Sequence, residues 1–238
     1  MPHLTRCHWL EANAFLTEGA GVTSSYPEIR DMLQDSIQHV ANIEGRRIIK
    51  THLPLAFLPP QLVDTCKVVY VCRNPADTAV SYYHWYEEKF AGSFATFIEM
   101  FCKGYVSYGN YFDHLCSGLK MKNHPNVKFL WYEDILKDTQ RTVQDISNFL
   151  ERPLTSENVG KIANLLSFEN MKQNPMVNPT SGLAKQKTFM RRGIVGDWRN
   201  HFDEHMITTW NTWIESHNNE PVLKKLDNLR MHHCRDDS

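Results

Sequence analysis

Two stretches of the sequence place polar side chains directly after an apolar run, where a strand would end. The first is RRIIKTH at 46–52, in which Lys50 and His52 follow two isoleucines. The second is KVVYVCR at 67–73, which ends in Arg73. Because ligands bind outside the carboxyl ends of the strands in open α/β sheets, both stretches are candidate site segments. The alternative for His52 is a simple loop residue.

The segment after Arg73 has the features of a helix start. Asn74 can cap the helix, Pro75 suits its first position, and Asp77 strengthens its first turn. An arginine beside a helix N-terminus can bind a phosphate or sulfate group. The alternatives are that Arg73 caps a loop or pairs with Asp77.

A second basic group lies in TFMRRGIVGDW at 188–198, where Arg191 and Arg192 precede Gly193. Two guanidinium groups and the backbone amides beside a glycine can approach one phosphate. A solvated basic turn is the alternative. The chain contains neither GxGxxG nor GxxxxGK[ST], which argues against a P-loop kinase or another nucleotidase.

The apolar periodicity predicts strands and helices that alternate along the chain. Such alternation indicates βαβ units and a parallel, layered α/β fold, here as one domain over 1–238. The expected strands are 46–52, 67–72 and 126–134, and the expected helices are 26–41, 139–150 with Asp138 as N-cap, and 155–168. Residues 173–188 are rich in Pro, Asn, Ser and Gly, which predicts a long loop.

The composition limits the classes of partner. The chain has 238 residues and a net charge of −1, which argues against broad binding to nucleic acids or membrane surfaces. No apolar run reaches the length of a membrane span. The six cysteines include no CxxC pair, which indicates reduced thiols and a cytoplasmic location. His232, His233 and Cys234 indicate a frayed tail rather than a metal site, so no metal is expected.

Five motifs occur in a fixed order: KTHLPLAFLP, VVYVCRNPADTAVSYYHWY, FLWYEDI, LSFENMKQNP and FMRRGIVGDW. Together they resemble the cytosolic sulfotransferases, which transfer a sulfonate group from 3′-phosphoadenosine-5′-phosphosulfate (PAPS) to small molecules. The resemblance runs from about residue 44 to about residue 200. It implies a three-layer fold related to that of P-loop proteins, with a parallel sheet flanked by helices on both faces.

The resemblance also implies roles for individual residues. His52 would be the catalytic base, and Lys50 would help to neutralise the transferring group. Arg73 and Ser81 would bind the 3′-phosphate of the cofactor. Tyr132 would contact the adenine, and Phe168 would stack nearby. The other expected cofactor contacts are Phe189, Met190, Arg191, Arg192 and Gly193, and the last three of these would complete the 3′-phosphate clamp.

These roles agree with the chemistry of the side chains. A neutral imidazole can take the proton from an acceptor hydroxyl at neutral pH. The oxygen would then attack sulfur in line, and cations aimed at the charged oxygens would stabilise the transition state. The expected partner is a small phenol, alcohol or amine, with no nucleic acid and no membrane partner.

Three departures from the family pattern stand out. Residues 1–45 contain no counterpart of the YPKSGTTW loop, which binds the phosphosulfate and follows a central strand in the family. Leu166 stands where the family usually has a threonine. The segment WRNHFDEHMITTW at 198–210 does not match the KxxxTVxxxE motif through which many family members form dimers. A homodimer is therefore possible, but not one that uses this motif.

Two hypotheses remain. In the first, the protein is a PAPS-dependent sulfotransferase with His52 as general base, and the sequence is an N-terminally incomplete copy that lacks one central strand. In the second, it is a non-catalytic, truncated relative that at most binds the 3′-phosphoadenosine part of the cofactor. If the phosphosulfate loop is absent, we expect no transfer, because little would hold the sulfur within attack distance.

Overall fold

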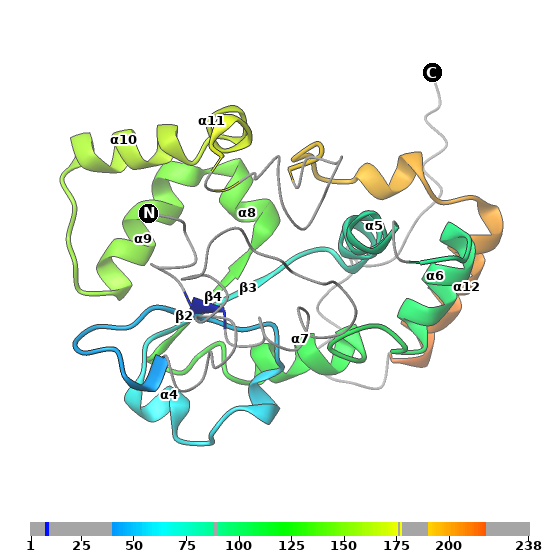
Figure 1. Cartoon of the computed structure of the whole chain (residues 1–238), viewed down its shortest axis with the longest axis horizontal. Coiled ribbons are helices and arrows are strands. Elements are labelled where there is room, and N and C mark those ends of the chain that lie inside the picture. The colour runs from blue at the N-terminus through cyan, green and yellow to red at the C-terminus, as the bar shows by residue number, and fades with distance from the viewer. Residues whose placement is uncertain (1–7, 10–39, 88–89, 176, 178–189, 218–238) are drawn as a thin grey trace. The chain divides into compact units, whose positions relative to one another are not determined.

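A computed structural model describes residues 8–9, 40–87, 90–175, 177 and 190–217 (Figure 1). The chain divides into two compact units. The first unit comprises residues 1–52 and 167–192, and the second comprises residues 53–166 and 193–238. The predicted helix at 26–41 lies outside the described residues except at its end, as does most of the predicted loop at 173–188.

The first unit contains a short parallel sheet and a short helix. Strand β1 (His8–Trp9) pairs with β2 (Ile49–Lys50), with His8 opposite Ile49 and Trp9 opposite Lys50. The prediction of a strand at 46–52 is therefore confirmed in type, although the strand is shorter. Helix α11 (Phe168–Gln173) begins after Ser167, whose hydroxyl accepts a hydrogen bond from the Asn170 amide.

The second unit contains the parallel pair β3 (Val68–Cys72) and β4 (Val127–Trp131), joined by a crossover through helices. Among the described strands, β3 is paired with β4 alone and β2 with β1 alone. The remaining elements of this unit are η2 (Leu55–Phe57), α4 (Leu62–Thr65), α5 (Pro75–Tyr86), α6 (Phe94–Cys102), α7 (Tyr111–Lys120), α8 (Tyr132–Lys137), α9 (Thr139–Phe149), α10 (Ser156–Leu165), η3 (Asp197–Asn200) and α12 (Glu204–Ser216).

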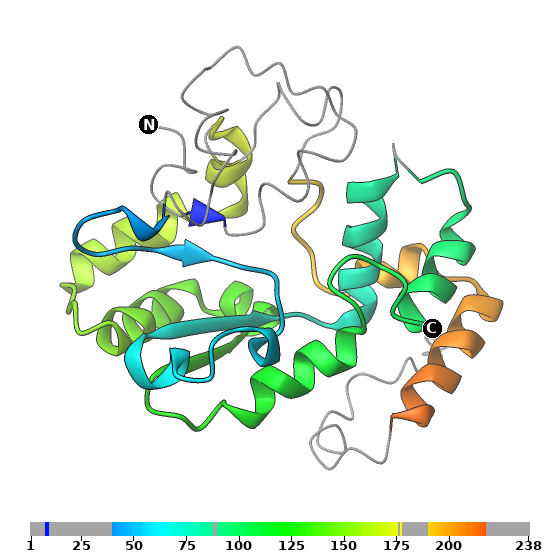
Figure 2. The ribbon, with the colours of Figure 1, turned by 60° about the horizontal axis from the view of Figure 1, so that its bottom comes forward.

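Helices lie on both faces of the β3–β4 sheet, which confirms the predicted α/β class (Figure 2). On one face, the buried Tyr70 ring stacks on Phe129, and its hydroxyl donates to the His114 carbonyl of α7 at 2.9 Å. On the other face, Lys128 of β4 forms an ion pair with Asp145 of α9 at 3.3 Å. The sheet is thus anchored to both neighbouring layers.

The apolar run of β3 is buried on one face of the sheet only. Tyr70 and Cys72 are buried, whereas Val69 and Val71 on the opposite face are 40% and 50% exposed. On this face, the ion pair between Lys128 and Asp145 joins α9 to β4. A continuous apolar sequence therefore concealed an alternating environment.

The expected strand at 126–134 ends earlier than predicted, because helix α8 begins at Tyr132. Glu133 and Asp134 lie in the first turn of that helix, where carboxylates interact favourably with the helix dipole. The predictions of helices at 139–150 and 155–168 hold. Asp138 caps α9 through the Arg141 amide at 2.9 Å, and the predicted helix at 155–168 corresponds to α10 and the start of α11.

The packing of α7 on the sheet depends on Gly118. A Cβ atom at this position would lie 2.3 Å from Cζ of the buried Tyr70 ring. We therefore expect Gly118→Ala to lower the free energy of unfolding by about 1–3 kcal/mol, as measured by urea denaturation. Gly160→Ala is the matched control, since nothing lies within 4 Å of a Cβ there. This helix-interior change should instead stabilise by about 0.5–1 kcal/mol; equal effects at the two positions would contradict the packing.

Candidate functional site

The junction between β3 and α5 is the most highly organised part of the candidate site. The Asn74 side chain accepts hydrogen bonds from the amides of Ala76 (2.9 Å) and Asp77 (3.3 Å), and Pro75 occupies the first helical turn. The predicted cap of this helix is therefore confirmed. The capped helix start follows directly on Arg73, at the carboxyl end of a parallel strand.

Two side chains from other elements fix the backbone of this junction. The Tyr111 hydroxyl donates to the Arg73 carbonyl and accepts from the Arg73 amide at 3.3 Å. Loss of solvation raises the pKa of the Tyr111 phenol above its ordinary range, so it keeps its proton and remains a donor. The Asn74 amide donates to Glu133 Oε1 at 2.7 Å. The backbone that carries Arg73 is thus held from both α7 and α8.

The Arg73 side chain is also held. Its guanidinium carbon lies 4.6 Å from the centre of the Tyr132 ring, and Nη2 donates to the Ile194 carbonyl at 3.4 Å. Arg73 Nε is buried and has no hydrogen-bond partner among the described residues. Arg73 also forms no ion pair with Asp77 in the described part of the chain, so the pairing considered from the sequence is wrong. A cation without a carboxylate partner is suited to bind an anion.

The segment that follows the Arg191–Arg192 pair packs on α5. Asp77 is 1% exposed, and its carboxylate accepts from the amides of Gly196 (2.6 Å) and Trp198 (3.0 Å). Gly193 and Gly196 have φ values of 67° and 82°, a left-handed conformation that favours glycine. The two glycines of RRGIVGDW thus serve the backbone path of this segment.

The structure brings some of the predicted cofactor residues together within the second unit. Arg73 and Tyr132 are in direct contact. Ser81 lies on α5, the helix that begins next to Arg73, and its side chain is exposed. Leu166, at the C-terminus of α10, is 46% exposed.

Gly193 also lies in the second unit, and the remaining predicted residues belong to the first unit. Lys50 is exposed and ends β2, and the half-buried His52 follows two residues later. Phe168 begins α11, and the Lys172 ammonium lies 5.7 Å from the centre of its ring. Met190 and Arg191 are half-buried, and Arg192 is exposed. Phe189 lies outside the described residues.

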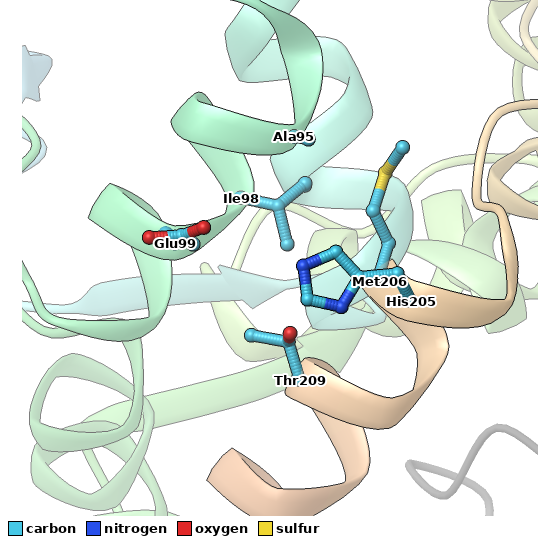
Figure 3. A pocket seen from close by; sticks show the side chains of 6 residues that line it. All are labelled: Ala95, Ile98, Glu99, His205, Met206 and Thr209. Atoms are coloured by element: carbon cyan, nitrogen blue, oxygen red, sulfur yellow. The ribbon is translucent and has the colours of Figure 1, made fainter.

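A hollow between α6 and α12 has no relation to this chemistry (Figure 3). Its empty volume is at most about 170 Å³, below the roughly 300 Å³ at which ligand pockets begin. Its lining consists of Ala95, Ile98, Glu99, His205, Met206 and Thr209. No group of three or more His, Cys, Asp or Glu side chains within the described residues could hold a metal ion.

Sequence reasoning missed three residues that organise the site. Tyr111 and Glu133 fix the Arg73–Asn74 backbone, and Asp77 binds the segment after Arg192. The sequence indicated Asp77 only as a first-turn helix residue. The sequence provided some indication of Glu133, because this residue directly follows Tyr132 in the WYED motif. Nothing in the sequence, however, placed Glu133 next to Asn74, which lies 59 residues earlier.

The chain is similar to known proteins both in sequence and in structure. The family model described as the sulfotransferase domain matches residues 2–229. Sulfotransferase 1E1 of Rattus norvegicus is 38% identical over 202 residues, which cover 81% of this chain and 68% of that protein. Sulfotransferase 1B1 of Canis lupus familiaris is 43% identical over 176 residues, which cover 70% of this chain and 60% of that protein. The chain thus spans between about three fifths and seven tenths of the length of these relatives.

Solved structures show the same fold. Retinol dehydratase in complex with androsterone and the inactive cofactor PAP has a TM-score of 0.74 at 33% identity, over 81% of this chain and 61% of that chain. A mouse sulfotransferase complexed with PAP has a TM-score of 0.71 at 32% identity, over 80% of this chain and 72% of that chain. The family match over nearly the whole chain, the curated relatives and these structures agree, and we conclude that the chain belongs to the sulfotransferase family.

Proposed function

We propose that this protein is a PAPS-dependent sulfotransferase that transfers a sulfonate group to a hydroxyl or amine of a small molecule. The observation that carries the proposal is the fixed and partly unpaired Arg73 at the β3–α5 junction. Membership of the sulfotransferase family supports it. So does the presence of PAP, the desulfonated form of the cofactor, in the related structures.

The proposed cofactor site selects a 3′-phosphorylated adenine nucleotide. Arg73 would bind the 3′-phosphate, because its guanidinium is oriented by Tyr132 and lies next to the capped start of α5. Tyr132 would also contact the adenine. Completing the site are Ser81, Phe168, Phe189, Met190, Arg191, Arg192 and Gly193.

The proposed chemistry assigns distinct roles to His52 and Lys50. PAPS supplies the sulfonate group, linked to a phosphate that can leave. His52 would take the proton from the acceptor hydroxyl as its oxygen attacks sulfur. The Lys50 ammonium would stabilise negative charge on the transferring group. Both residues come at or just after the end of β2, where a parallel strand delivers side chains to a site.

The proposed acceptor is a small phenol, alcohol or amine. Two related structures of retinol dehydratase contain androsterone or retinol, which are apolar alcohols. No helix within the described residues is long and apolar enough to cross a membrane. We place the protein in the cytoplasm, in line with the cytosolic sulfotransferases that its motifs resemble, and fractionation of cells that express it would test this location.

The proposal is tested by incubating the purified protein with radiolabelled PAPS and a panel of phenols, alcohols and amines. Label transferred to an acceptor above the level of a His52→Ala control is the expected result for a form of the protein that carries a phosphosulfate loop, and no transfer is expected without that loop. Calorimetric titration with PAP and with AMP, which lacks the 3′-phosphate, separates the alternatives. Selective binding of PAP without any transfer would favour the non-catalytic relative, and the absence of both transfer and PAP selectivity would refute the proposed function.

A further inference from the structure

A buried carboxylate joins two segments that are more than a hundred residues apart in the sequence. Asp77 on α5 is 1% exposed, and its two oxygens accept separate hydrogen bonds, Oδ2 from the Gly196 amide at 2.6 Å and Oδ1 from the Trp198 amide at 3.0 Å. A buried charge is costly unless it is hydrogen-bonded. Both amides belong to the RRGIVGDW segment, four and six residues after Arg192.

Polar contacts rather than apolar burial hold the first half of this segment. Ile194 and Val195 are 44% and 52% exposed, so their side chains contribute little to its position. The contacts that fix it are the two amide hydrogen bonds to Asp77 and the hydrogen bond from Arg73 to the Ile194 carbonyl at 3.4 Å. Trp198, which is 6% exposed, anchors only the end of the segment in the core.

We propose that Asp77 is a positioning residue for recognition of the 3′-phosphate. Its carboxylate holds residues 196–198 on α5, and this sets the backbone path of Gly193 and the position of the Ile194 carbonyl, which accepts a hydrogen bond from Arg73. Asp77 does not touch the phosphate; it acts through Arg73, which donates to the Ile194 carbonyl, and through the Gly193 amide. This inference rests on the proposed function, because it assigns Asp77 to the same cofactor site.

The proposal distinguishes Asp77 from a residue that only stabilises the fold. A general loss of stability weakens the binding of PAP and of AMP to the same degree, because both ligands need the folded protein. Displacement of Arg73 and of the Gly193 amide weakens the binding of PAP alone, since AMP has no 3′-phosphate. The ratio of the two dissociation constants therefore reports on positioning and is insensitive to stability.

The test uses Asp77→Asn, which keeps the shape of the side chain but replaces one acceptor oxygen with a donor NH₂ group. One backbone amide then faces a donor, and the charge is lost. We expect the preference for PAP over AMP, measured by calorimetric titration, to fall about tenfold or more, consistent with the loss of a hydrogen bond to a charged group. The control is Asp138→Ala, which removes the N-cap of α9 and should leave this preference unchanged.

Hydrogen exchange provides a second measurement that does not depend on how well the variant folds. In the wild-type protein the amide protons of Gly196 and Trp198 should be protected, because Asp77 accepts from both. Rapid exchange of both protons in the wild type would overturn the inference. So would an Asp77→Asn variant that retains the full preference for PAP, and in that case the proposed function would stand. A wild-type protein with no preference for PAP would instead refute the proposed function itself.

Discussion

Replacement of His52 with alanine, in a form of the protein that carries a phosphosulfate loop, is expected to lower kcat for sulfonate transfer by at least about two orders of magnitude, the usual contribution of a general base. The proton of the acceptor hydroxyl would then have no positioned group to receive it. Affinity for PAP should change little, because the proposed base acts on the acceptor and not on the 3′-phosphate. The measurement is a steady-state assay with radiolabelled PAPS, combined with calorimetric titration of PAP.

A second histidine provides the matched control. His124 is also partly buried and lies 3.6 Å from the Asp64 carboxylate, in a turn that precedes β4. His124→Ala removes an imidazole of similar exposure from a place with no proposed catalytic role, so kcat should stay within about threefold of the wild type. Near-normal turnover by the His52 variant would exclude His52 from the mechanism, whatever the behaviour of the control.

Replacement of Arg73 with glutamine is expected to weaken PAP binding about 100-fold or more while AMP binding is largely retained. Charge-assisted hydrogen bonds contribute about 1.5–3 kcal/mol each, and an arginine can form two of them with one phosphate. Tyr132, Tyr111 and Glu133 hold Arg73 and its backbone before the ligand arrives. Little ordering of this side chain would therefore oppose binding.

Arg199 is the matched control for this second prediction. Its guanidinium carbon lies 4.5 Å from the centre of the Trp198 ring, much as that of Arg73 lies 4.6 Å from the centre of the Tyr132 ring. Arg199→Gln removes a cation with the same kind of aromatic contact, so the preference for PAP should persist. A loss of preference in both variants would show that general positive charge, and not the position of Arg73, controls nucleotide binding.

Local sequence signals determined much of the framework around Arg73. The order Asn74, Pro75 and Asp77 predicted the start of α5, because each of these residues satisfies a requirement of a helix N-terminus within a few positions. The apolar runs predicted β3 and β4, and the motif order predicted the family. The same signals overextended β4, because the residues of WYED fit a strand as well as the first turn of α8.

The roles predicted for His52, Lys50 and the FMRRG segment remain predictions from family resemblance. The sequence also specified Leu166 and the segment at 198–210 as departures from that family. These features depend only on which residue occupies a position, so they can be taken directly from the sequence. The sequence shows which side chains are present, but it does not show which of them are in contact.

Only the tertiary structure decided what surrounds Arg73. Tyr111, which bonds to the Arg73 backbone, lies 38 residues later in the sequence. Glu133, which accepts a hydrogen bond from the Asn74 amide, lies 59 residues after Asn74. Asp77, a helix-start residue by sequence, meets amides 119 and 121 residues later. Helix capping is a local interaction and can be read within one turn, whereas these contacts depend on how distant elements pack, which no local pattern encodes. The sequence thus determined that an arginine, Arg73, stands next to the start of a helix. The packing of α7, α8 and the segment at 193–198 determined that the Arg73 side chain is held in place. It also determined that Arg73 has no carboxylate partner among the described residues.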